Sequence, residues 1–546
     1  MDTRKVWMYV SLGIITLLNF VMAGSLELYA DEAYYALYSR FPDWGYFDHP
    51  PAVGILIFIG TLFAKTELGV RIIFILLTSA SYYLLYDWIK PKNYSLFWLV
   101  VLALFPVQLM GFMALPDMPL FFFAILFFRC FQRYIQNESL LNIFLLALCI
   151  AGMLYSKYHG ALIILFSFFA VPKFFLRKSF YLLTLISVLL YLPHFIWLYQ
   201  HEFSSIQYHF FERSASTYRF SFTLEYIAAF IFYNGPLVFA LLLWNAFTSK
   251  SANNFESVLK VNILGFFLFF LLSSFKGRVE ANWTFMALIP ALYLGFSQEV
   301  KFEKLLRTSA IISLALIALF RIHLLHPIVE FKKDRAYEYR GHANWASEIF
   351  EHSKGKPIVA NRYQEASLLS YYGNQFVPAI NINSRKNQFD FWATVDAFEN
   401  KDVLILKRGD APEGTKQFLH PYFGKYYLAE IKSLQLLRYP EILAEEIKQE
   451  GNTVKVSFKV KTQNSVQSER AIYTRVAVFN EEARADTLLE LSIQAINNRE
   501  LQQLQLAWPY SGKIKHLEIE ILSDSLEVWK NKKVQIENGR DYLQTP

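Results

Sequence analysis

Carboxylates are concentrated directly after the first hydrophobic run of the chain. Asp31 and Glu32 follow this run, and Asp48 and His49 close the same loop, ahead of two prolines that fix the direction in which the chain leaves it. Asp117 begins a later apolar run, where the helix dipole also favours a carboxylate. A carboxylate that faces a cavity can take a proton from a hydroxyl group as a general base. The alternative reading makes Asp31 and Glu32 solvated loop charges and Asp117 an N-terminal helix charge.

Cations and further polar residues occupy other loops of the chain. The cations are Lys157, Lys276 and Arg278, and Glu280 and Asn282 enter a helix just after the last two of them. Lysine and arginine can neutralise the negative charge that develops on a departing phosphate. Acids and cations together therefore predict a transferase with a phosphate leaving group. An ordinary solvated turn is the alternative for the lysine–glycine–arginine segment.

Long apolar runs must position these residues. The chain has 546 residues, of which 54% are hydrophobic and 18% charged, and this bias indicates a membrane protein. A spanning helix needs about 20 mainly apolar residues. Such runs begin near Val6, Val70, Ser95, Pro119, Leu140, His159, Phe180, Leu224, Val258, Trp283 and Thr308. We therefore expect a polytopic α-helical protein with about eleven transmembrane helices.

The direction of the spans follows from lysine and arginine, which concentrate in cytoplasmic loops. The run at residues 51–64 has only about fourteen residues, fewer than a span needs, so we expect it to lie in the membrane interface. The loops predicted as cytoplasmic then hold most of the cations, among them Arg4, Lys5, Lys90, Lys92, Lys173, Arg177, Lys178, Lys301, Lys304 and Arg307. This places the N-terminus inside and puts the acidic loops and the C-terminal part on the outer side. A cleavable signal peptide is the alternative for the first run, because basic residues precede it and small residues end it.

Composition and spacing argue against several other classes of protein. The net charge of +7 is modest for this length, and its cations belong to membrane-facing loops, so nucleic acid is not an expected partner. Cys130 and Cys149 are the only cysteines and lie in apolar runs, which excludes a secreted disulfide scaffold. No glycine-rich phosphate loop of the Walker type is present. His49, His159 and His209 have no closed zinc-site spacing, and structural roles explain them more simply.

Five segments resemble those of the C-type membrane glycosyltransferases that use polyprenyl-phosphate sugars. They are DEAYY at residues 31–35, YFDHPPAV at 46–53, LPDMPLFFF at 115–123, SKYHGAL at 156–162 and KGRVEANW at 276–283. The pattern is similar to that of the bacterial lipid A aminoarabinose transferases and the protein O-mannosyltransferase group. NRYQEASLLSYY at 361–372 and SRKNQFDFW at 384–392 also resemble segments of bacterial members. The resemblance implies a C-type glycosyltransferase fold and inversion at the anomeric carbon.

The resemblance also implies roles for individual residues. Asp31 is the implied catalytic carboxylate, Glu32 its neighbour in the site, and Asp117 the second essential acid. His49 stands where members place a basic residue against the donor phosphate, and Asp48 where some members place a carboxylate ligand of a divalent metal ion, the one cofactor implied. The other candidates for binding the donor phosphate are Lys157, Lys276 and Arg278. The candidate substrate-binding residues are Tyr34, Tyr35, Glu280, Asn282, Arg362 and Tyr363.

Two positions depart from the family pattern. Tyr34 stands where the aminoarabinose transferases often have an arginine. His49 replaces a lysine before the proline pair, so a phosphate contact there would depend on pH.

The pattern after about Leu325 changes from apolar runs to that of a soluble domain. We therefore expect a membrane domain at residues 1–325, with a first outer loop at 25–69. KPIVAN at 356–361 and DVLILKR at 402–408 are typical of buried strands, which predicts an extracytoplasmic α/β domain at 331–425. Alternating segments such as NTVKVSFKVKT at 452–462 predict an antiparallel β-rich domain at 426–546, in the form of a small sandwich. This outer part either binds the acceptor, covers the site or acts as an inert stabilising cap.

These features predict a glycosyltransferase of the bacterial cytoplasmic membrane that acts on the periplasmic face. It would move a sugar from an undecaprenyl-phosphate donor to a hydroxyl or phosphate of an acceptor, which is an envelope glycolipid such as lipid A, a glycan or a protein. The alternative is a transporter or flippase of a lipid-linked glycan. Transporters of this kind usually contain internal repeats, and no such repeat is evident in the sequence. A scaffold that binds an envelope partner is a third alternative, but it leaves the acidic clusters without a shared purpose.

Overall fold

The structure is a computed structural model that describes most of the chain. The described residues are 3–209, 213, 218–235, 237–251, 253–297, 299–329, 334–380, 386–392 and 397–434, together with the backbone of seven later strands. The chain forms two compact units, Met1–Gly341 and His342–Pro546, and each is described by itself. The finer domain limits given above stay predictions, and the segment SRKNQFDFW lies partly outside the described residues.

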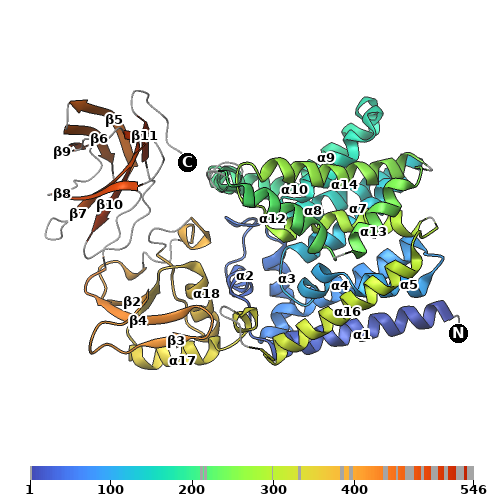
Figure 1. The fold of residues 1–546 in the computed structure, drawn as a ribbon, viewed down its shortest axis with the longest axis horizontal. Helices are drawn as coiled ribbons and strands as arrows, with labels where there is room; N and C mark the ends of the chain where they lie inside the picture. The colour runs from blue at the N-terminus through green and yellow to red at the C-terminus, as the bar shows by residue number, and fades with distance from the viewer. Residues whose placement is uncertain are drawn as a thin grey trace. The chain divides into compact units, whose positions relative to one another are not determined.

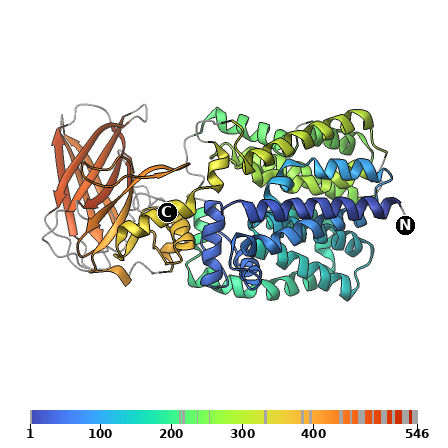
Figure 2. The same ribbon diagram turned by 90° about the horizontal axis from the view of Figure 1, so that it is seen from below.

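Long apolar helices form the frame of the first unit. Among the described residues, six helices are long and apolar enough to cross a membrane: α1 (Thr3–Ser25), α4 (Glu67–Ile89), α7 (Asp117–Gln136), α10 (Lys178–Gln200), α14 (Asn254–Ser273) and α16 (Glu303–Leu325). Helices of this size are about 30–35 Å long, which matches the hydrocarbon core of a bilayer. Figures 1 and 2 show α1 and α16 side by side, with α2 (Ala30–Arg40) across the end of α1. The prediction of a polytopic helical membrane protein is confirmed.

The other predicted spans form shorter or interrupted helices. They are α5 (Tyr94–Leu102) with α6 (Phe105–Met110), α8 (Leu140–Ser156), α9 (Gly160–Phe169), α12 (Phe220–Phe232) with α13 (Val238–Thr248), and η3 (Ala281–Ala287) with α15 (Leu288–Phe296). Between α12 and α13, Gly235 and Leu237 have φ values of 115° and 61°, which no α-helix continues through. The run at 51–64 forms α3 (Ala52–Thr61), which is about 15 Å long and shorter than the hydrocarbon core of a bilayer. Its location in the membrane interface stays a prediction. The smaller helical elements are η1 (Pro172–Leu176), α11 (Ser204–Gln207) and η4 (Arg335–Tyr339).

Backbone outside regular helices is buried between α6 and α7. Phe112 and Ala114 are fully buried in this stretch. The Gly111 carbonyl accepts hydrogen bonds from Thr78 Oγ1 at 2.8 Å and from Asn19 Nδ2 at 3.4 Å. Side chains from α4 and α1 thus provide hydrogen-bond donors to a carbonyl group that lies outside the regular helices. Contacts with α1 and α4 thus fix the segment that leads to the start of α7.

A small mixed sheet and two helices begin the second unit. The sheet has the order β1-β2-β4-β3, formed by β1 (Ile358–Ala360), β2 (Val403–Arg408), β4 (Gly424–Ile431) and β3 (Phe418–His420). The first pair is parallel and the other two pairs are antiparallel. The helical elements are α17 (His342–Ser353), α18 (Tyr363–Tyr372) and η5 (Gln388–Asp390). A core of Val359, Ile380, Val403, Ile405 and Leu434 is buried here, so the predicted strands KPIVAN and DVLILKR are confirmed.

Antiparallel strands make up the rest of the second unit. They are β5 (Glu441–Glu450), β6 (Thr453–Lys461), β7 (Ile472–Asn480), β8 (Ala485–Ile493), β9 (Gln502–Pro509), β10 (Ile514–Ser523) and β11 (Val534–Glu537). They pair in two sheets of order β11-β10-β7-β8 and β5-β6-β9. The predicted antiparallel region is confirmed, and its packing as a sandwich stays a prediction.

Candidate active site

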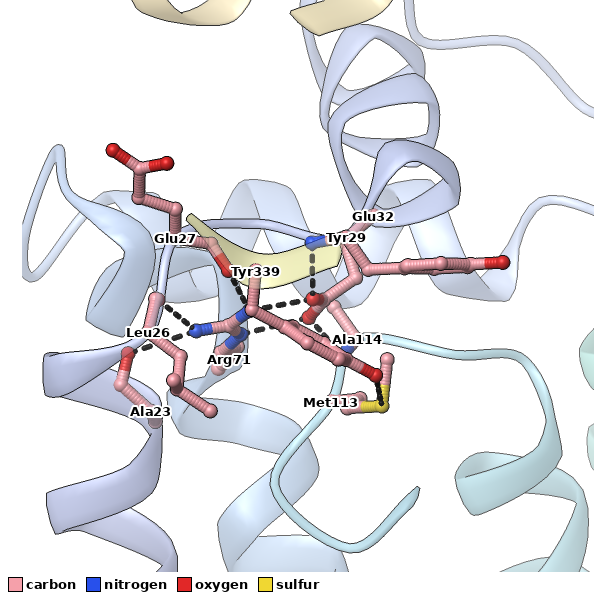
Figure 3. Close-up of polar contacts among 9 residues, drawn as sticks. All are labelled: Ala23, Leu26, Glu27, Tyr29, Glu32, Arg71, Met113, Ala114 and Tyr339. Atoms are coloured by element: carbon pink, nitrogen blue, oxygen red, sulfur yellow. Dashed lines mark hydrogen bonds and ion pairs between the residues drawn. The ribbon is translucent and has the colours of Figure 1, made fainter. Parts of the chain in front are cut away.

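A buried ion pair connects the first acidic motif with α4. The side chains of Glu32 and Arg71 are fully buried, and an N–O distance of 2.6 Å joins them. Arg71 Nε and Nη2 donate to the two carboxylate oxygens of Glu32. Its Nη1 and Nη2 also donate to carbonyl groups at the end of α1, those of Ala23, Leu26 and Glu27. Figure 3 shows the guanidinium enclosed by these groups, so its five N–H donors are all used by the protein.

The same carboxylate holds the second acidic motif next to the first. Glu32 Oε1 accepts a hydrogen bond from the Ala114 backbone at 2.8 Å, and Oε2 accepts one from the Tyr29 backbone at 3.0 Å (Figure 3). Ala114 lies shortly before Asp117 in the sequence, and Asp31 directly precedes Glu32. The segments that carry the two predicted acids are therefore joined by a direct hydrogen bond.

The two acids of the first motif have different environments. Glu32 accepts four hydrogen bonds from protein donors and is shielded from solvent. Asp31 is only half-buried in the first turn of α2, where the helix dipole stabilises an ionised carboxylate. The Glu32 carboxylate is therefore occupied by contacts within the protein, whereas Asp31 is the more accessible of the two, and their roles stay predictions.

A second buried ion pair forms where three distant segments meet. Lys157 Nζ donates to Asp117 Oδ1 at 2.8 Å, and Asn282 Nδ2 donates to the same oxygen at 3.2 Å. Asp117 begins α7, Lys157 ends α8 and Asn282 lies in η3, and both charged side chains are almost fully buried. Asp117 is the single hydrogen-bond partner of the ammonium among the described residues, so two of its N–H groups are available to a ligand. The sequence analysis named these three residues as site candidates in three different roles, and the structure brings them together.

The end of the first outer loop is ordered by aromatic side chains. The Tyr34 hydroxyl donates to Asp48 Oδ2 at 2.7 Å, and both groups are buried. The Tyr35 ring meets the His49 ring edge-on, with 5.4 Å between the ring centroids. His209 Nε2 lies 3.0 Å from the carbonyl oxygen of Asp48 and donates to it. Tyr34 and Tyr35 thus orient Asp48 and His49.

Two histidines near Lys157 have a ring nitrogen without a hydrogen-bond partner. The Nδ1 atoms of His49 and His159 are buried, and neither has a hydrogen bond within the described part of the chain. Burial lowers the pKa of both rings well below the usual range, and the nearby Lys157 charge lowers it further. His49 is therefore neutral and would contact a phosphate as a hydrogen-bond donor rather than as a cation. The Trp283 ring lies 5.2 Å from the His159 ring and 4.6 Å from the Arg213 guanidinium. The stacked guanidinium places the positive charge of Arg213 near His159.

Comparison with known proteins relates this arrangement to a group of enzymes. No curated protein matches the sequence. A family model described as dolichyl-phosphate-mannose-protein mannosyltransferase matches residues 48–197, a range that contains Asp48, Asp117 and Lys157. The structure of ArnT from Cupriavidus metallidurans in the apo state is similar with a TM-score of 0.55 and 13% identity, over 78% of this chain and 98% of that chain. The same protein bound to undecaprenyl phosphate gives a TM-score of 0.56 and 12% identity, over 77% and 97%.

The chain has the fold of the C-type membrane glycosyltransferases. The fold implied by the five sequence segments is thereby confirmed.

Some predicted site residues lie on the surface of the first unit. Lys276 and Arg278 are exposed, and Arg278 is 3.4 Å from Glu225. Glu280 is partly exposed and lies 3.7 Å from Arg213. Exposed pairs of this kind contribute little to stability. The roles of these residues in donor or substrate binding stay predictions.

The two candidate residues of the C-terminal part belong to the second unit. Arg362 is exposed just before α18, and its backbone N–H donates to Glu365 Oε2 at 3.1 Å. Tyr363 is the first residue of α18 and is partly buried. Their contribution to substrate binding stays a prediction.

Contacts with α10 fix the first outer loop, and the sequence interpretation missed them. Trp197 Nε1 donates to Asp43 Oδ2 at 2.9 Å, and His194 Nδ1 donates to the Trp44 carbonyl at 2.7 Å. A Cβ atom on Gly45 would lie 2.5 Å from the Trp197 ring, so only glycine allows this approach. The available signal was His194, a titratable residue inside an apolar run.

The described residues do not fit the metal site implied for Asp48. Among them, no group of three or more histidine, cysteine, aspartate or glutamate side chains could hold a metal ion. The Asp48 carboxylate accepts a hydrogen bond from Tyr34 in this arrangement. No step of the reaction is therefore assigned to a metal.

Proposed function

We propose that the chain transfers a sugar from a polyprenyl-phosphate donor to an acceptor at the outer face of the cytoplasmic membrane. The observation that carries this proposal is the buried group of Asp117, Lys157 and Asn282, in which the ammonium and carboxylate are 2.8 Å apart. It lies at helix ends and adjoins the segment of Asp31 through the Glu32–Ala114 hydrogen bond. Lys157 would supply the positive charge that stabilises a departing phosphate, and Asp31 would supply the carboxylate that takes the proton of the acceptor.

The donor class is supported by chemistry and by a relative. The ArnT structure of the same fold was solved with undecaprenyl phosphate. In this chain, Lys157 has N–H groups available, and the neutral rings of His49 and His159 have unpartnered Nδ1 atoms next to it. These donors would bind the oxygens of a lipid phosphate held at the membrane surface.

Asp31 is the proposed general base. The hydroxyl oxygen of the acceptor attacks the anomeric carbon, and its proton passes to the Asp31 carboxylate. The bond between the anomeric carbon and the phosphate oxygen breaks, and its electron pair stays on the polyprenyl phosphate. Lys157 stabilises the additional negative charge on this leaving group, while Asp117 and Asn282 hold the side chains of the group in place. Inversion at the anomeric carbon follows from the direct displacement.

The acceptor belongs to the cell envelope in this proposal. Lipid A or another glycolipid, a glycan and a protein are the candidate acceptors, each presenting a hydroxyl or phosphate oxygen. The second unit would then lie on the periplasmic side, where it binds the acceptor or covers the site.

Transfer by the purified protein in liposomes tests the proposal. With a radiolabelled polyprenyl-phosphate sugar and an envelope extract, label should move to an acceptor, and Asp31→Asn and Asp117→Asn should each lower the rate about 100-fold or more. Asp87→Asn is the matched control, because Asp87 forms a partly exposed pair with Arg129. Full activity in both site variants would contradict the assignment. Vectorial movement of the labelled lipid without transfer would instead indicate a transporter.

A further inference from the structure

Arg321 is a buried arginine within the membrane-spanning helix α16. Only 8% of the residue is exposed, although α16 is one of the six long apolar helices among the described residues. A charged group at this position is costly unless its charge and its N–H donors are matched.

The protein uses only part of the Arg321 guanidinium. Nη2 donates to Asn19 Oδ1 at 2.8 Å and to the Gln108 carbonyl at 2.5 Å. Nε and Nη1 are buried and have no hydrogen-bond partner in the described part of the chain. None of the ion pairs between described residues includes Arg321. The two hydrogen bonds of Nη2 use two of the five N–H groups and leave the charge and the other three N–H groups unexplained.

The surroundings of Arg321 provide further donors. Tyr82 is fully buried, and both Tyr82 and Arg321 form hydrogen bonds with Gln108. The Tyr82 oxygen accepts a hydrogen bond from Gln108 Nε2 at 3.2 Å, and its own hydrogen has no acceptor among the described residues. Phe112 lies between two arginines, with its ring centroid 5.9 Å from the Arg321 guanidinium carbon and 5.9 Å from that of Arg71. The region therefore has positive charge and unused N–H and O–H groups, which together favour an anion.

We propose that a small monovalent anion, a halide such as chloride, binds between Arg321 and Tyr82. One negative charge balances the single uncompensated arginine, whereas a divalent anion would leave a buried net charge. A spherical ion can accept hydrogen bonds from Nε, Nη1 and the tyrosine hydroxyl without a directional requirement. The bound ion would connect α4 and α16 beside the segment of Gln108 and Phe112, which leads to Asp117. This site is separate from the donor-phosphate group and does not depend on the proposed function.

Halide-dependent stability of the full chain in detergent tests the site. At constant ionic strength, replacing potassium gluconate by potassium chloride or bromide should raise the thermal unfolding midpoint in a saturable way. Arg321→Gln should abolish this response, and Tyr82→Phe should shift it to a several-fold higher halide concentration. Arg307→Gln is the matched control on the same helix, because Arg307 forms an exposed pair with Glu303, and it should respond as the wild type does. Equal midpoints of the wild type in gluconate and in halide would overturn the proposal.

A second measurement does not depend on whether Arg321→Gln folds. A structure of the wild-type protein crystallised in bromide should show anomalous density within hydrogen-bond distance of Arg321 Nε and Nη1. A water molecule at this position, with no anomalous density, would overturn the proposal.

Discussion

Replacing Glu32 by glutamine tests whether the buried ion pair positions the two acidic motifs. Each Glu32 oxygen accepts two N–H donors, one from Arg71 and one from the backbone of Tyr29 or Ala114. Glutamine has nearly the same shape but only one acceptor oxygen. In either orientation of its amide, the NH2 group would face two donors, and the Arg71 charge would lose its counter-charge.

The expected magnitude follows from these losses. An orphaned buried donor costs about 1–3 kcal/mol, and removing one member of a buried ion pair costs about 3–5 kcal/mol in total. The two descriptions overlap, so we expect Glu32→Gln to lower the free energy of unfolding by about 3–5 kcal/mol. The transfer rate should fall as well, because the Ala114 contact that places the segment of Asp117 is weakened.

Thermal unfolding in detergent and the liposome transfer assay measure the two effects. Arg71→Met should reduce activity as strongly as Glu32→Gln, because all five N–H groups of Arg71 contact protein. The double variant should be less destabilised than the sum of the single variants, since it leaves no lone buried charge. Asp87→Asn, at a partly exposed pair, should change stability by less than about 1 kcal/mol.

Two results would refute this reasoning. Unchanged unfolding and unchanged transfer in Glu32→Gln would show that the ion pair positions nothing. Loss of transfer in Glu32→Gln together with full activity in Arg71→Met would show that Glu32 acts on the substrate itself.

Lys157, the first outer loop and the second unit each give one further prediction. Lys157→Gln should lower kcat in the transfer assay by about 100-fold, whereas the exposed Lys276→Gln should have a far smaller effect, and equal losses would contradict the assignment. Gly45→Ala should destabilise the protein by about 1–3 kcal/mol, because a Cβ atom would lie 2.5 Å from the Trp197 ring, and an unchanged thermal midpoint would contradict this. Burial lowers the pKa of His420 to about 3, so between that pH and about 6.5 the unfolded state binds the proton and the folded state does not. The free energy of unfolding of the second unit should be highest above about pH 6.5 and fall by up to about 1.4 kcal/mol per pH unit towards pH 3. Amide hydrogen exchange in β3 should therefore accelerate as the pH falls, and no acceleration would contradict the prediction. His420→Asn should flatten the dependence.

The sequence was sufficient to assign Asp117, Lys157 and Asn282 to one face of the membrane as site candidates. Lys157 and Asn282 come from predicted loops on the same membrane face as Asp117, and the topology of the apolar runs put those loops together. Local residue types and the positive-inside rule carry this information. The hydrogen bonds of both residues to Asp117 Oδ1 are contacts that the sequence interpretation did not specify.

The different environments of Asp31 and Glu32 could not be read from the sequence. Both are acidic residues at the start of one helix, and their environments depend on contacts with distant parts of the chain. Arg71 is 39 residues and Ala114 is 82 residues from Glu32. No periodic pattern encodes pairings over such separations, which arise from tertiary packing.

The interruptions of the apolar runs were also missing from the sequence interpretation. Hydropathy measures how apolar a segment is and does not report where a helix stops. The run beginning near Leu224 contains Gly235, and the structure divides it into α12 and α13 at that place. Glycine and proline in that run were the usable signal.

A structure of the protein with a polyprenyl phosphate bound would test the central claim most directly. The phosphate should lie within hydrogen-bond distance of Lys157 Nζ, with the Asp31 carboxylate facing the position of the transferred sugar. A phosphate bound by other residues, with Lys157 hydrogen-bonded to Asp117 and not to the phosphate, would contradict the account.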